Sequence, residues 1–185
     1  AWCIVPFDAK NRGPADRAEM VRRLGLKRVA YDWREKHIPE FEQEILEYKK
    51  NGIEYFAFWG WHDSMESLIK QHGIKPQIWE MFRGKLPEGT DEEKVKFVAQ
   101  QFLPIAEKAK SLGLKFGIYN HGGWPGEPAN LIAICDYLRK NRGLDNVGIV
   151  YNFHHGHADI EGFEEKFKLL KPFLICLNLN GMAEP

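Results

Sequence analysis

Short apolar runs alternate along the chain with longer stretches whose apolar residues recur at helical spacing. The runs have the length of buried strands, and glycines or prolines separate many of them from the helical stretches. Strands are therefore predicted at residues 2–7, 27–33, 54–61 and 75–82, and inside the stretches 115–124, 147–157 and 174–181. Helices are predicted from Pro14 to a stop at Gly25, over 38–50, from Asp63 toward Gly73, and over 92–112, 127–138 and 161–170.

Strands that alternate with helices predict parallel β/α units, and seven such units in succession favour a barrel. We expect one α/β domain over residues 1–185, a parallel (β/α) barrel of the TIM type. Such a barrel usually has eight units and about 250 residues, so we expect the C-terminal unit to be missing. A fragment, an open barrel, and a barrel closed by another chain or by a non-standard element all stay open. A doubly wound sheet is less favoured, because no glycine-rich phosphate loop follows any strand.

The composition narrows the classes of partner. The chain carries 26 basic and 26 acidic residues, so its zero net charge predicts neither a nucleic-acid nor a membrane partner. No apolar run approaches the roughly 20 residues that cross a bilayer. Cys3, Cys135 and Cys176 lie in apolar stretches, which predicts buried thiols. The chain begins at Ala1, so removal of a leader stays open, with a lean toward the cytoplasm.

Three of the predicted strands end in asparagines and histidines. The stretches read KFGIYNHGGW, VGIVYNFHHGH and LICLNLNG. They place Asn120, Asn152 and Asn178 at the carboxyl ends of strands, where parallel α/β folds gather loops and bind ligands. We expect these three residues to share one mouth with residues that end other strands, namely Asp8, Trp33, Trp61 and Glu80.

These stretches resemble the strand-end motifs of the sugar phosphate isomerase/epimerase family, the xylose isomerase-like TIM barrels, in unit order over nearly the whole chain. The resemblance implies a divalent metal such as Mn, Mg, Co or Zn. By position, the first three metal ligands of the family fall on Asn120, Asn152 and Asn178, and the fourth belongs to the eighth strand. A substrate-contacting histidine of the family falls on His155, and a substrate-contacting glutamate falls near Glu127.

Asparagines at three ligand positions argue against an inherited metal site. Neutral amides offer a divalent cation no charge compensation, whereas the family supplies carboxylates and an imidazole. The amides would instead hydrogen-bond to one another or to a polyol. If a metal is bound, we expect it on His121, His155, His157 and Glu80, and a chain without any cofactor is an equally open expectation.

Asparagine also cannot take a proton from carbon, which the isomerisations of the family require. The acid–base work must then move to His155, His121 or Glu80, because imidazoles titrate near neutrality and burial raises the pKa of a carboxyl group. In an extended strand, Asn152 and His154 would share one face and His155 would lie on the other, unless the chain turns there. The alternatives are that the histidines have purely structural roles and that Glu80 forms an ion pair.

Tryptophans lie at or near several predicted strand ends, where a sugar ring could stack while its hydroxyls meet amides and imidazoles. For each of them core packing is the alternative. The predicted substrate-binding residues are Asn120, Asn152, Asn178, Glu127, Trp61, Trp124 and His154.

Two functions from different classes follow. The first is an enzyme similar to sugar isomerases and epimerases, acting on a sugar or keto-sugar by isomerisation, epimerisation, or a related elimination or hydration. The second is a non-catalytic carbohydrate-binding barrel that has lost the metal site. The histidine cluster favours the enzyme, because a binding module does not need it. The expected partner is a small-molecule carbohydrate, and a homo-oligomer stays open.

Overall fold

The computed structural model describes residues 2–4 and 9–179, without the side chains of Trp2 and of residues 157–159. It consists of two compact units, residues 1–78 and 79–185. Asp8, one of the residues expected at the mouth, lies outside the described residues. Within the described part, no helix has the length and apolar character that a membrane span requires.

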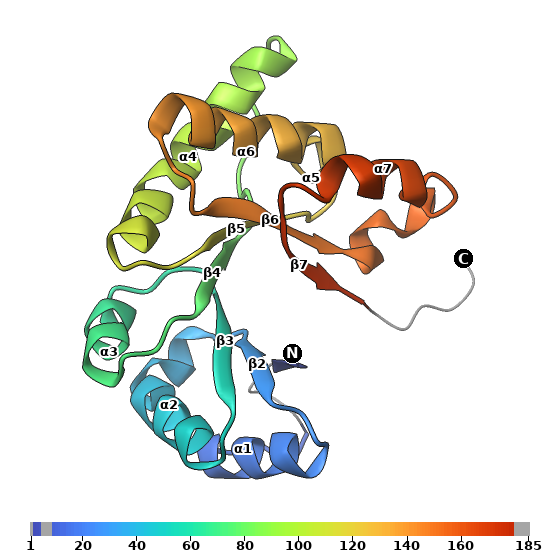
Figure 1. Cartoon of the computed structure of the whole chain (residues 1–185). Helices are drawn as coiled ribbons and strands as arrows, with labels where there is room; N and C mark the ends of the chain where they lie inside the picture. The colour runs from blue at the N-terminus through green and yellow to red at the C-terminus, as the bar shows by residue number, and fades with distance from the viewer. Residues whose placement is uncertain (1, 5–8, 180–185) are drawn as a thin grey trace. The chain divides into compact units, whose positions relative to one another are not determined.

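The first unit holds three complete strands and the start of a fourth. Its elements are β1 (Trp2–Ile4), α1 (Pro14–Arg23), β2 (Arg28–Tyr31), the 3₁₀ helix η1 (Glu35–Glu40), α2 (Phe41–Lys50), β3 (Glu54–Trp59), α3 (Ser64–His72) and the start of β4 (Gln77–Glu80). Helices α1 and α2 lie side by side (Figure 1). Tyr31 and Phe58 of the strands stack with ring centroids 6.3 Å apart, and Phe41 of α2 meets both rings edge-on.

A buried ion pair joins α1 to α2. Arg17 is 2% exposed and Glu44 is 0% exposed. The guanidinium donates from Nε to Oε1 of Glu44 at 3.0 Å and from Nη2 to Oε2 at 2.6 Å. The Tyr48 hydroxyl also donates to Glu44. Burial by itself would lower the pKa of Arg17, but the hydrogen bonds and charge of Glu44 outweigh it, so this pKa lies above its ordinary value.

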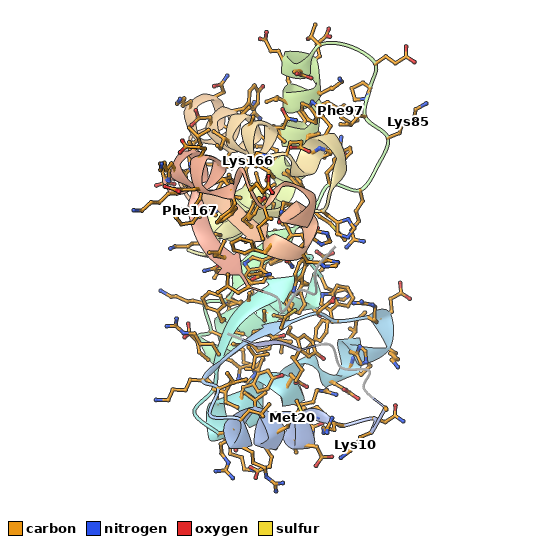
Figure 2. The ribbon with its side chains drawn as sticks, turned by 90° about the vertical axis from the view of Figure 1, so that its right-hand side faces the viewer. Lys10, Met20, Lys85, Phe97, Lys166 and Phe167 are labelled. Atoms are coloured by element: carbon orange, nitrogen blue, oxygen red, sulfur yellow. The ribbon has the colours of Figure 1, made fainter. Side chains whose placement is uncertain are left out.

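The second unit completes the β/α succession. Its elements are α4 (Asp91–Ser111), β5 (Phe116–Tyr119), the short α5 (Gly123–Gly126), α6 (Pro128–Arg142), β6 (Val147–Asn152), the 3₁₀ helix η2 (Phe153–Asp159), α7 (Phe163–Leu170) and β7 (Leu174–Asn178). Figure 1 shows α4 and α6 side by side along β5 and β6. Phe97 of α4 contacts Phe82, on the loop after β4 that also carries Lys85 (Figure 2).

In the sheet the seven strands follow the order of the chain, β1 to β7. The pairs β1–β2, β2–β3, β5–β6 and β6–β7 are parallel. Each described strand falls inside its predicted range, β2 to β7 are shorter than theirs, and helices follow the strands as predicted. The predicted helix over residues 38–50 is in fact the end of η1 followed by α2, and the pattern did not predict α5.

Two glycines in register make room for the core of the second unit. Gly117 of β5 pairs with Gly148 of β6. A Cβ on Gly117 would lie 2.8 Å from Cδ1 of Trp79, and a Cβ on Gly148 would collide with Ile175. Real side chains do not approach so closely, so Gly117 makes room for the Trp79 indole and Gly148 makes room for the Ile175 side chain. Trp79 is 1% exposed, which makes it a core residue rather than a tryptophan at the rim.

The prediction of buried thiols is correct for Cys135 and wrong for Cys3, which is exposed. The next residue, Ile4, is buried, and successive side chains of a strand point to opposite faces. An apolar stretch therefore does not bury every residue in it. Cys176 is partly buried, and burial raises its pKa.

Candidate functional site

The second unit places its predicted site residues at the carboxyl ends of its strands. Glu80 is the last residue of β4, Asn152 of β6 and Asn178 of β7, and Asn120 directly follows β5. The carboxyl ends of parallel strands are the usual place for ligands in α/β folds.

Asn120 is 1% exposed, and its side chain bonds to the main chain of β6. Its Nδ2 donates to the carbonyl oxygen of Asn152 at 3.0 Å, and its Oδ1 accepts from the backbone nitrogen of Asn152 at 2.6 Å. One side chain thus satisfies both main-chain groups of a residue on the neighbouring strand. The expectation is that the amides bond to one another or to a polyol, whereas the Asn120 amide bonds to the main chain of Asn152.

Asn152 uses its own side chain to begin the next turn. It is 8% exposed, its Nδ2 donates to the hydroxyl of Tyr119, and its Oδ1 accepts from the backbone nitrogen of His154 at 2.8 Å. An asparagine oxygen that accepts from the residue two positions later is a common start for a turn or helix. The chain therefore leaves the extended conformation at Phe153, where η2 begins.

This turn brings together two histidines that follow different strands, His121 after β5 and His155 after β6. The ring centroids of His121 and His155 lie 4.6 Å apart, and the Tyr119 ring meets His155 edge-on at 5.5 Å. His154 is exposed, with its ring centroid 5.2 Å from that of His155. The arrangement expected for an extended strand, with Asn152 and His154 on one face, does not apply, because the chain turns into η2 after Asn152.

The surroundings of His155 favour its neutral form. His155 is partly buried, and burial, followed by the charges of His121 and His154, lowers its pKa below the ordinary value of 6.5. His155 is therefore an uncharged imidazole at neutral pH, able to donate from one nitrogen and to accept at the other.

We expect an NMR titration to show an apparent pKa below 6.5 for the His155 ring in the wild type. In His121→Ala this pKa should rise toward 6.5, because a neighbouring positive charge is removed. Since the folded-state pKa is the lower one, the stability that His155 contributes is present above the unfolded pKa and lost as the pH falls through the folded pKa. Equal ring titrations in wild type and variant would show that the two imidazoles do not interact.

The described residues do not fit the metal site that the resemblance implies. They contain no group of three histidine, cysteine or acidic side chains that could hold a metal, so Glu80, His121 and His155 do not form one. The side chain of His157, the fourth expected ligand, lies outside the described residues. Both amides at the first two ligand positions bond within the protein, and Oδ1 of Asn178 accepts from Sγ of Cys176 at 3.4 Å.

Trp124 and Glu127 lie on the segment after β5. The indole Nε1 of Trp124 donates to Oδ1 of Asp91 at 2.9 Å, and Nζ of Lys94 lies 5.7 Å from its ring centroid. One contact of this ring is therefore with a cation of α4. Glu127 is exposed just before α6. The burial of Tyr151 raises the pKa of its hydroxyl, and the charge of Glu127 raises it further.

In the first unit, Trp33 and Trp61 follow β2 and β3. The Trp33 ring stacks on Phe58 at 5.8 Å and is tilted by 14°, and its Nε1 donates to the carbonyl of Trp59. Trp61 donates from Nε1 to Oδ1 of Asp63 at 3.0 Å. Both tryptophans are partly exposed, and Trp33 packs within its own unit.

Tyr119 was not predicted as a site residue. It is buried, its hydroxyl accepts from Asn152, and its ring contacts both His121 and His155. The alternation of side chains along β5 could have identified Tyr119, because Tyr119 and His121 are two residues apart and share a face of an extended chain.

The sequence matches no protein-family model and no curated protein. The structure, however, is similar to several solved structures. It matches an epimerase, 3-keto-D-glucoside 4-epimerase YcjR from E. coli, with a TM-score of 0.69 and 13% identity over 96% of this chain and 76% of the other. It matches D-psicose 3-epimerase, solved in the presence of D-fructose, with a TM-score of 0.65 and 15% identity over 95% and 71% of the two chains.

The chain has a xylose isomerase-like TIM-barrel fold. The α/β fold class predicted from the sequence is thereby confirmed. This fold is shared with sugar epimerases and with the IOLI protein. The IOLI structure contains a bound zinc atom. It matches this chain with a TM-score of 0.66 and 16% identity over 91% of this chain and 69% of the other. That zinc belongs to the related protein, and at this identity only the fold carries over.

Proposed function

We propose that the chain binds a sugar or keto-sugar at the ends of β5 and β6, and that it moves a proton there with His121 and His155. The observation that carries the proposal is the contact of the two imidazoles, whose ring centroids lie 4.6 Å apart. A pair of groups that titrate near neutrality can supply both an acid and a base to one substrate. The sugar epimerases that share the fold support the choice of substrate class.

The lowered pKa of His155 assigns the roles. As a neutral imidazole, His155 donates one N–H to the carbonyl oxygen of the sugar. His121, which is exposed and reachable by a ligand, takes the proton from the carbon beside that carbonyl. The electron pair of the C–H bond forms the C=C bond of an enediolate, and the negative charge moves to the oxygen held by His155. An isomerisation is completed when His121 returns the proton to the former carbonyl carbon and the proton of the neighbouring hydroxyl passes to the oxygen held by His155. An epimerisation instead requires a second group to deliver a proton to the opposite face of the first carbon.

Glu80 stays an alternative proton carrier, because it ends β4 and is partly exposed. The residues at the family's ligand positions do not fit its metal, so no step of this mechanism runs through one. In this mechanism the His155 N–H stabilises the oxyanion.

Replacement of His155 by alanine tests the substrate contact. We expect His155→Ala to weaken the binding of a keto-sugar, or its turnover, by about 1 to 3 kcal/mol, the usual cost of leaving a buried polar partner unpaired. Binding of D-fructose and of a 3-keto-glucoside would be measured by calorimetry. The matched control is His72→Ala, because His72 bonds to Glu42 in the first unit. Equal affinity and activity in wild type and His155→Ala would refute the role.

The alternative function, a non-catalytic carbohydrate-binding barrel, is supported by the two amides that hold structure instead of ligand. It predicts binding of sugars with no exchange of carbon-bound protons in D₂O. Binding that depends on His155, together with an absence of proton exchange, would favour this alternative over the enzyme.

A further inference from the structure

We propose that Asn120 and Asn152 act as a positioning clip that holds His121 and His155 together, instead of binding a ligand or a metal themselves. The clip is a set of four hydrogen bonds: the Asn120 amide makes two with the main chain of Asn152, and the Asn152 amide makes one with the Tyr119 hydroxyl and one with the backbone nitrogen of His154. The inference rests on the proposed function only in treating the two histidines as the site.

The first half of the clip extends the sheet beyond its last residue. The final main-chain bond from β5 to β6 runs from the nitrogen of Asn120 to the carbonyl of Val150, at 3.4 Å. Two residues further along β6, the Asn120 amide takes over and bonds to both main-chain groups of Asn152. A side-chain amide has a donor and an acceptor in one plane, as a peptide group has. It therefore replaces the ladder while the backbone turns at Gly122, whose φ is +72°.

The second half of the clip fixes the start of η2. Oδ1 of Asn152 accepts from the nitrogen of His154, and Nδ2 donates to the Tyr119 hydroxyl. Asn152 is thus held to the end of β5 through its main chain, and it holds the start of η2 through its side chain. Close packing of Gly156 against the Tyr151 hydroxyl, where a Cβ would collide, fixes the following turn. These restraints place His155, three residues after Asn152, against His121, which directly follows Asn120.

The chemistry of the clip requires amides. An aspartate at position 120 could accept from the nitrogen of Asn152, but its second oxygen would face the carbonyl of Asn152 without a hydrogen to share. A carboxylate of the kind that binds metals would therefore repel the strand that the amide joins. The asparagines at these positions are consistent with a site held by hydrogen bonds.

The first test is Asn120→Asp, with stability followed by chemical denaturation between pH 4 and pH 8. Buried beside a carbonyl, the introduced carboxyl group should have a pKa above its ordinary value of about 3.9. When protonated it can donate to Asn152 as the amide does. Stability should therefore approach that of the wild type near pH 4 and fall as the pH rises through the raised pKa, with an unfolding constant about 10 to 100 times larger at pH 8. A variant as stable as the wild type at every pH would overturn the clip.

The second test separates positioning from general stability and needs no sugar. In Asn152→Ala the acceptor for His154 is lost, so the nuclear Overhauser contacts between the ring protons of His121 and His155 should disappear. Asn152→Asp keeps that acceptor, and the Tyr119 hydroxyl can turn to donate to it, so the contacts should be retained. Ring contacts that persist in folded Asn152→Ala would overturn the positioning role, whether or not the chain acts on sugars.

Zn²⁺ added to the wild type provides the third test. If the amides form the clip, their side-chain resonances and the denaturation midpoint should not change with Zn²⁺. A raised midpoint together with shifted Asn120 and Asn152 amide resonances would make the asparagines metal ligands and overturn the proposal.

Discussion

Replacement of His121 by alanine is expected to slow proton exchange on a keto-sugar by about 10² to 10⁴-fold, the usual loss when a general base is removed. His121 is exposed, and its ring centroid lies 4.6 Å from that of the partly buried His155, closer than the 5.2 Å of the exposed His154. The measurement is the incorporation of deuterium from D₂O into D-fructose or a 3-keto-glucoside, followed by NMR. Binding of the sugar should change much less than the exchange rate, because His121 acts on the reacting proton.

His72→Ala serves as the control, since it removes an imidazole from the first unit. The same loss in this control would point to a general effect of histidine removal. Exchange in His121→Ala at the wild-type rate would exclude His121 as the base, and a loss in Glu80→Gln would then assign the role to Glu80.

Removal of the Glu44 carboxylate is expected to lower the free energy of unfolding by about 3 to 5 kcal/mol. Glu44 is fully buried, and its loss leaves the buried Arg17 guanidinium with the carboxylate of Glu40 as the acidic partner that Nη2 keeps. Arg17 cannot escape by losing its proton, because a guanidinium stays protonated in proteins. Glu44→Ala should therefore unfold at a much lower urea concentration than the wild type.

Two further variants locate the cause of this loss. Glu54→Ala removes the partner of Arg28 in an exposed pair, and it should cost at most about 1 kcal/mol. The double variant Arg17→Met with Glu44→Leu should recover much of the loss, because it removes both buried charges. A double variant as unstable as Glu44→Ala would show that packing, and not the unpaired charge, determines the effect.

The comparison with the IOLI protein shows that a chain of this fold can hold zinc. In the present chain, the positions that correspond to metal ligands by resemblance carry amides. The two buried amides, those of Asn120 and Asn152, join β5 to β6. We infer that these hydrogen bonds set the geometry of the histidines, since each histidine follows one of the two amides closely in sequence.

The sequence by itself determined the fold class and the strand ends. Apolar runs of strand length, alternating with helical stretches, could be satisfied by few arrangements other than parallel β/α units, and the solved structures confirm that fold. The positions of Asn120 and Asn152 at strand ends also followed from where the apolar runs stop. These features are local, because each depends on residues that are near one another in the chain.

Only the tertiary structure decided what the side chains at those ends do. Nothing in the sequence shows that the Asn120 amide bonds to the main chain of a strand 32 residues later, or that η2 turns His155 onto His121. The pairing of Arg17 with Glu44 across 27 residues is equally invisible. Hydrogen bonds and ion pairs depend on distances of a few ångströms between distant parts of the chain, and a pattern of apolar and polar residues carries no such distances.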